Sequence, residues 1–150
     1  MAEALLWRYD SLPMKRIVMV EDHRLFAEGV RQLLSRTGKY RVVSQFETAE
    51  MALKRIPKLW PDLVLMDLSL PFMNGLEATR RLKLERPDLP VVILSMYGDR
   101  ALLRLGIDLG INGFVLKSSG FNDLLLAMEA VLAGEHYFSP GLTEGLLGDS

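Results

Sequence analysis

The chain has 150 residues, of which 49% are hydrophobic and 25% charged, and this profile is typical of one globular domain with a sizeable core. A net charge of -1 argues against a nucleic-acid-binding surface, and the absence of cysteine excludes disulfides and thiolate metal sites. No apolar stretch is long enough to span a bilayer, and the N-terminus lacks the pattern of a signal peptide. We therefore expect a cytoplasmic protein with no membrane contact.

Strand and helix patterns alternate along the chain. Residues 1–14 match no later period, and we interpret them as an N-terminal extension or a tag remnant. Short apolar or alternating runs predict five strands, and helical spacing of apolar residues predicts a helix after each of them. The predicted strands are 15–20, 40–46, 62–67, 91–94 and 113–116, the first helix runs from about 24 to 36, and the last covers 121–132.

This alternation predicts an α/β domain over residues 15–134, built on a five-stranded, doubly wound parallel sheet with helices on both faces. The strand at 40–46 is expected at the sheet edge, and Pro57 and Pro61 are expected to bracket a loop. Residues 135–150 include several glycines, and we interpret them as a linker stump.

The central predicted strand is apolar until it reaches Asp67. A carboxylate at the end of a buried strand must be solvated, capped, paired or bound to a metal, because burial of an isolated charge is costly. Solvation is the ordinary outcome for such an aspartate. The interpretation changes only if other strands bring polar groups to the same edge.

Four predicted strands end in polar side chains, and in such a sheet the binding crevice lies outside the carboxyl ends of the strands. Each residue has an ordinary alternative: Asp22 as a helix N-cap, Lys117 as a solvated lysine, Ser95 as a turn former. Their joint placement beside Asp67 instead predicts a site that accepts a phosphoryl group. The residues concerned are Glu21, Asp22, Asp67, Ser95 and Lys117.

The acidic members of this set also predict a metal. Three neighbouring carboxylates raise each other's proton affinity unless a cation joins them. Mg²⁺ prefers oxygen ligands, one or two of them carboxylates, and keeps several waters. We therefore expect Mg²⁺ as the cofactor at Glu21, Asp22 and Asp67.

The motifs at these strand ends resemble the receiver domain of two-component response regulators, over about residues 15–133. The resemblance rests on IVMVEDH at 17–23, LMDLSLPFMNG at 65–75, VILS at 92–95 and GFVLK at 113–117. It implies a flavodoxin-like (CheY-like) sheet with strand order 2-1-3-4-5, an arrangement for which receiver proteins are a standard example. It further implies a protein that is not an enzyme beyond its own phosphorylation and dephosphorylation.

The resemblance assigns a role to each site residue. Asp67 is the implied phosphoacceptor, and Asp22, Asp67 and the main-chain carbonyl of Ser69 are the implied Mg²⁺ ligands, with Glu21 acting through water. Lys117 would neutralise phosphoryl oxygens and Ser95 would hydrogen-bond to the phosphate. Phe114 matches the family's switch aromatic, with an ordinary core phenylalanine as the alternative. Glu21 departs from the family's usual aspartate by one methylene group, which could alter the ion geometry.

Two further stretches, DHRLFAEGV at 22–30 and GEHYFSP at 134–140, resemble the NarL/FixJ (LuxR-type) subfamily. The implied partners are a sensor histidine kinase as phosphodonor, a second copy in a homodimer, and DNA only through a helix-turn-helix output domain absent from this chain. We expect a part of a longer transcription regulator, with a stand-alone receiver as the alternative.

Three other functions are open to test. The first is a dehalogenase-type phosphatase, although Ser69 occupies the place of its second acid. The second is a flavodoxin relative, although the loop after the first strand is acidic where a phosphate cradle is expected. The third is a receiver that acts through protein contacts without phosphorylation, which the intact acidic set disfavours.

Overall fold

The computed structural model describes residues 13–142. Strands and helices alternate through this range, and every pair of neighbouring strands is parallel. The residues 1–12 of the expected extension and 143–150 of the expected linker lie outside the described part. The elements are β1 (Lys15–Val20), α2 (Arg24–Thr37), β2 (Tyr40–Phe46), α3 (Ala49–Leu59), β3 (Leu63–Asp67), α4 (Gly75–Glu85), β4 (Val91–Ser95), α5 (Arg100–Leu109), β5 (Gly113–Leu116), a 3₁₀ turn (Lys117–Ser119), α6 (Phe121–Leu132) and β6 (Tyr137–Phe138).

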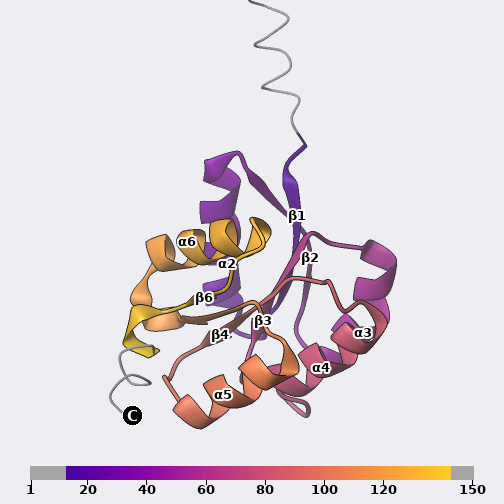
Figure 1. The fold of residues 1–150 in the computed structure, drawn as a ribbon. Helices are drawn as coiled ribbons and strands as arrows, with labels where there is room; N and C mark the ends of the chain where they lie inside the picture. The colour runs from indigo at the N-terminus through magenta and orange to yellow at the C-terminus, as the bar shows by residue number, and fades with distance from the viewer. Residues whose placement is uncertain (1–12, 143–150) are drawn as a thin grey trace, which may run out of the picture.

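The strands form one sheet in the order β2-β1-β3-β4-β5-β6. This order confirms the predicted 2-1-3-4-5 arrangement, with β2 at one edge. Figure 1 shows α2 and α6 on one face of the sheet and α3, α4 and α5 on the other. Among the described residues no helix combines the length and the apolar composition that a membrane crossing requires.

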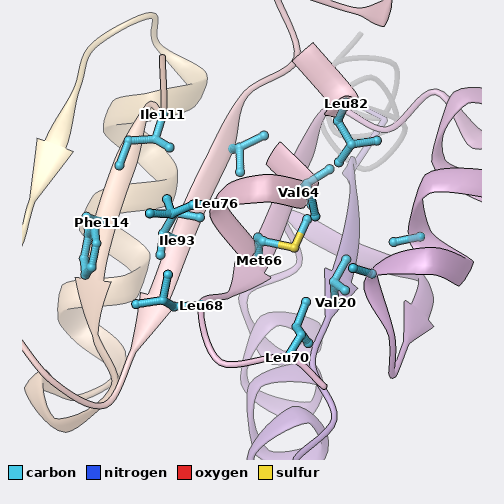
Figure 2. Close-up of a cluster of buried hydrophobic side chains, with 14 of the residues drawn as sticks. Val20, Val64, Met66, Leu68, Leu70, Leu76, Leu82, Ile93, Ile111 and Phe114 are labelled. Carbon is cyan, nitrogen blue, oxygen red and sulfur yellow. The ribbon is translucent and has the colours of Figure 1, made fainter. Parts of the chain in front are cut away.

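Two apolar cores lie on the two faces because successive strand residues point in opposite directions. On β3, Val64 and Met66 belong to the core under α3, α4 and α5, whereas Leu63 and Leu65 belong to the core under α2 and α6. Figure 2 shows the first core, with Phe114 lying beside residues of β4 and α4. β1, β3 and β4 carry apolar residues on both faces, as expected for central parallel strands.

Local signals in the sequence set several of the helix ends. Thr48, Asn74 and Asp99 are N-caps whose side chains accept backbone N–H bonds, and Gly38 and Gly110 end α2 and α5 in left-handed conformations.

The prediction that Pro57 begins a loop was wrong, because α3 continues to Leu59. Proline in the last turn forgoes only one intrahelical hydrogen bond. The amide of Trp60 still donates to the carbonyl of Ile56, at 3.0 Å, and this bond closes the turn.

The sheet has a sixth strand that the five-stranded prediction lacked. β6 pairs with β5 through Gly113 opposite Tyr137 and Phe114 opposite Phe138. Thus the first residues of the segment that we interpreted as a linker pack on the domain, as far as the buried Leu142. Two strand residues are too few to give a period in the sequence, which explains why the pattern indicated only a linker.

Candidate functional site

The strand register brings three ionisable residues to one corner of the sheet. Glu21 follows β1, Asp67 ends β3 and Lys117 follows β5. Each continues the alternate positions that face α2 and α6, namely Met19, Leu65 and Val115. Three separate strands therefore deliver their polar residues to the same face at the same edge.

Lys117 lies close to both of the carboxylates at this corner. Its Nζ lies 2.5 Å from Oε1 of Glu21 and 3.4 Å from Oδ1 of Asp67. It also lies 4.6 Å from the ring centroid of Phe26 on α2, within the range of a cation–π contact. Only 7% of the lysine side chain is exposed. The ammonium is thus fixed between two carboxylates, with its apolar stem and one aromatic ring excluding water.

Glu21 is fully buried, and Oε2 of its carboxylate has no hydrogen-bond partner. The pKa of Glu21 is raised to about 8, chiefly by burial and then by the neighbouring Asp67, while Lys117 opposes the shift. An orphaned buried carboxylate oxygen is costly unless a proton or a cation meets it.

The acidic residues satisfy the donor requirement of a hard cation. Glu21, Asp22 and Asp67 each offer a carboxylate oxygen, and these three atoms lie within 4.8 Å of one another. Asp22 is exposed whereas Asp67 is 4% exposed, so the group opens to solvent on one side. The orphaned Oε2 of Glu21 and this all-oxygen donor set fit Mg²⁺, which takes carboxylate ligands together with water.

The helix-capping alternative for Asp22 does not hold. The N-cap of α2 is His23, and no side-chain hydrogen bond caps this helix end. The carboxylate of Asp22 is therefore not engaged in capping α2.

The loop after β3 folds back closely on Asp67. The amide of Ser69 donates to Oδ1 of Asp67 at 3.2 Å, and the amide of Gly75 donates to the carbonyl of Leu68 at 2.9 Å. A Cβ atom at Gly75 would lie 2.2 Å from the main-chain oxygen of Asp67. Only glycine permits the backbone at position 75 to come this close to the backbone of Asp67. This close packing holds the backbone of Asp67 and Ser69 in place.

The two proposed switch residues lie on neighbouring strands, with Ser95 at the end of β4 and Phe114 within β5. Ser95 is 3% exposed, and its hydroxyl donates to the carbonyl of Tyr97 at 2.8 Å and accepts from the amide of Tyr97 at 3.2 Å. Phe114 is fully buried in the core under α3, α4 and α5. In this structure Ser95 therefore bonds within its own turn, as the turn-former alternative predicts, and Phe114 points inward.

Sequence reasoning missed three polar residues that meet near β5. The carboxylate of Asp123 on α6 accepts hydrogen bonds from the hydroxyls of Tyr137 and Ser139. An aspartate in the first turn of a helix is usually explained by the helix dipole, so its position gave no signal of burial. The sequence also indicated no site role for Phe26, whose ring lies against Lys117.

The family comparison identifies the domain. Residues 17–129 match the family model described as the response regulator receiver domain. The chain belongs to this family. It is a receiver domain of a two-component response regulator of the LuxR/NarL type, which decides against the phosphatase and flavodoxin alternatives.

Individual relatives agree with this membership. The chain is 36% identical to the transcriptional regulatory protein DegU of Brevibacillus brevis, over 88% of this chain and 56% of DegU. A LuxR-family response regulator from Aurantimonas sp. has a similar structure, with a TM-score of 0.88 and 34% identity over 91% of this chain and 98% of that one. RcsB from Salmonella enterica, solved bound to a promoter with the phosphomimetic BeF3-, gives a TM-score of 0.80 and 27% identity over 88% of this chain and 66% of RcsB.

This chain spans only about half the length of the DegU relative. The receiver match ends at residue 129, so residues 130–142 lie beyond it although they are part of the described fold.

Proposed function

We propose that Asp67 accepts one phosphoryl group from a phosphohistidine of a sensor histidine kinase. The observation that supports this most directly is the position of Lys117, whose ammonium lies 2.5 Å from Glu21 and 3.4 Å from Asp67 at the open edge of the sheet. Phosphoryl transfer depends mainly on positioning and on charge neutralisation. A preorganised cation beside the acceptor carboxylate supplies both.

In this proposal Asp67 is the nucleophile, and Lys117 balances the charge. The Oδ atom of Asp67 that attacks phosphorus forms the new P–O bond as the P–N bond to the donor histidine breaks. Lys117 lies where it can offset the charge on the transferring oxygens. Asp22, Asp67 and the carbonyl of Ser69 are the proposed ligands of Mg²⁺, with Glu21 acting through water, and the ion when bound would neutralise phosphoryl charge.

We propose that Ser95 and Phe114 convert this chemistry into a change of surface. A phosphoryl group on Asp67 offers new acceptor oxygens to the hydroxyl of Ser95, in competition with its bonds to Tyr97 at 2.8 and 3.2 Å. A ligand can only shift an equilibrium between states that it binds unequally, and these competing bonds provide the difference. The expected change lies on the face formed by α5, β5 and α6.

The proposed output is transcription regulation through a DNA-binding domain outside this chain. The relative DegU is described as a transcriptional regulatory protein, and RcsB has been solved on a promoter. A sensor kinase partner, a possible homodimer and a cytoplasmic location follow from the same proposal.

The test is phosphorylation by acetyl phosphate in the presence of Mg²⁺, followed by intact mass measurement. The expected product carries one acid-stable, hydroxylamine-labile phosphoryl group. The Asp67→Asn variant is expected to carry none, whereas Asp88→Asn, which alters a side chain that is 83% exposed, should react like the unsubstituted protein. An unmodified wild type would instead favour a receiver that acts through protein contacts alone.

A further inference from the structure

A buried hydrogen-bond network ties the C-terminal segment to α6. Asp123 is 8% exposed, and its carboxylate accepts from the hydroxyl of Tyr137 and from the hydroxyl of Ser139, the latter at 2.6 Å. Ser139 is fully buried. We refer to Asp123, Tyr137 and Ser139 as the Asp123 clasp. Hydrogen bonds to a buried charged group are stronger than those between neutral groups, so the clasp holds its hydroxyls in fixed positions.

Ser139 is the member of the clasp that bonds to the end of β5. The Ser139 hydroxyl, which donates to Asp123, also accepts from the amide of Leu116 at 2.9 Å. The amide of Ser139 donates to the carbonyl of Phe114 at 2.9 Å. Leu116 immediately precedes Lys117, so this hydroxyl fixes the backbone from which the lysine reaches the carboxylates.

The position of Lys117 depends on this anchor because regular pairing stops there. β5 ends at Leu116, and Lys117 begins a 3₁₀ turn. Loss of the Ser139 hydroxyl would leave the amide of Leu116 and one oxygen of Asp123 without their partner. A small backbone shift at Leu116 would move a charged group that lies at 2.5 Å from one carboxylate and 3.4 Å from another.

We propose that Ser139, held by Asp123, is a positioning residue for Lys117 in the phosphorylation of Asp67. This inference rests on the proposed function. Ser139 touches no reacting atom and transfers no proton. It lies outside residues 17–129, which match the family model, so the segment after α6 completes the site.

The first experiment compares two variants of the full chain that each lose one hydroxyl from the same carboxylate. Tyr137→Phe removes a bond to Asp123 but leaves the contact between Ser139 and Leu116, whereas Ser139→Ala removes both. With acetyl phosphate and Mg²⁺, Ser139→Ala is expected to phosphorylate about fivefold more slowly, the equivalent of roughly one hydrogen bond. Tyr137→Phe should stay within about twofold of the wild type. Equal rates for the two variants would overturn the proposal.

A second experiment separates positioning from general loss of structure. The Ser139→Ala change is repeated in a Lys117→Ala background, and both rates are followed by intact mass. If Ser139 acts through Lys117, adding Ser139→Ala to the Lys117→Ala variant is expected to cause no further loss of phosphorylation rate. An equal fold-loss in both backgrounds would contradict the proposal. Failure of the wild type to become phosphorylated would contradict the proposed function itself, so the two failures are distinguishable.

Discussion

Lys117 contacts Glu21 more closely than it contacts Asp67, at 2.5 Å compared with 3.4 Å, although Glu21 lies 96 residues earlier in the chain. The lysine is therefore held chiefly by the buried Glu21 and less closely by Asp67, the proposed phosphoacceptor. Removal of one partner of a buried ion pair leaves an uncompensated charge. We therefore expect the stability of the site to depend on pH, and we expect phosphoryl oxygens on Asp67 to compete with Glu21 for the ammonium of Lys117.

Without metal, the free energy of unfolding is expected to fall as pH rises from about 5 to 8 because of Glu21. The pKa of Glu21 is raised from 4.5 to about 8, chiefly by burial. Between these values the folded state holds a proton that the unfolded state has released, so stability decreases with rising pH. Urea denaturation in EDTA at several pH values measures this slope.

The Glu21→Gln variant is the control for that prediction. Glutamine keeps the shape of the side chain but does not titrate, so the difference in unfolding free energy between the two proteins should change in favour of the variant as pH rises. A difference that stays constant from pH 5 to 8 would show that Glu21 is ionised throughout this range.

Gly75→Ala and Gly29→Ala are expected to change stability in opposite directions. At Gly75 a Cβ would lie 2.2 Å from the main-chain oxygen of Asp67, so the backbone must shift at a cost of about 1–3 kcal/mol or more. At Gly29, inside α2, a Cβ would lie 3.8 Å from Cζ of Phe121, which is an ordinary contact. Alanine there should stabilise the protein by roughly 0.5–1 kcal/mol. Urea denaturation of both variants checks the two signs, and a stabilised Gly75→Ala protein would refute the close packing.

Tyr137 is expected to make the domain sensitive to alkaline pH. Burial and the bond to Asp123 raise the pKa of Tyr137 from 10.0 to about 12. The unfolded tyrosine loses its proton at lower pH than the folded one, so its contribution to stability is complete below pH 10 and is lost as pH rises toward 12. The melting temperatures of the wild type and of Tyr137→Phe should converge over this pH range. A constant difference between the two melting temperatures would show that the Tyr137 hydroxyl does not bond to Asp123.

The resemblance to receiver domains implied the strand order that the structure has, and the strand-end residues predicted the edge at which the polar side chains meet. Apolar runs located β1, β3, β4 and β5, and the acids and the lysine that follow them stand out because a polar residue directly after a buried strand breaks the pattern. Parallel topology then brings strand ends together without any knowledge of side-chain contacts.

Local patterns could not predict which groups pair within the site. The contacts of Lys117 with Glu21 and with the ring of Phe26 are matters of three-dimensional packing. The clasp was missed for a related reason. Ser139 and Leu116 are 23 residues apart, and polar residues after a glycine resemble a linker until a buried partner such as Asp123 is known.

The most direct test of the central claim is to locate the modified residue after treatment with acetyl phosphate and Mg²⁺. Borohydride reduces an aspartyl phosphate to homoserine, which peptide mass spectrometry identifies by position. We predict homoserine at position 67 and at no other acidic residue, including Glu21 and Asp22. Homoserine at another position, or none in a protein that carries a phosphoryl group, would contradict the assignment of Asp67 as the phosphoacceptor.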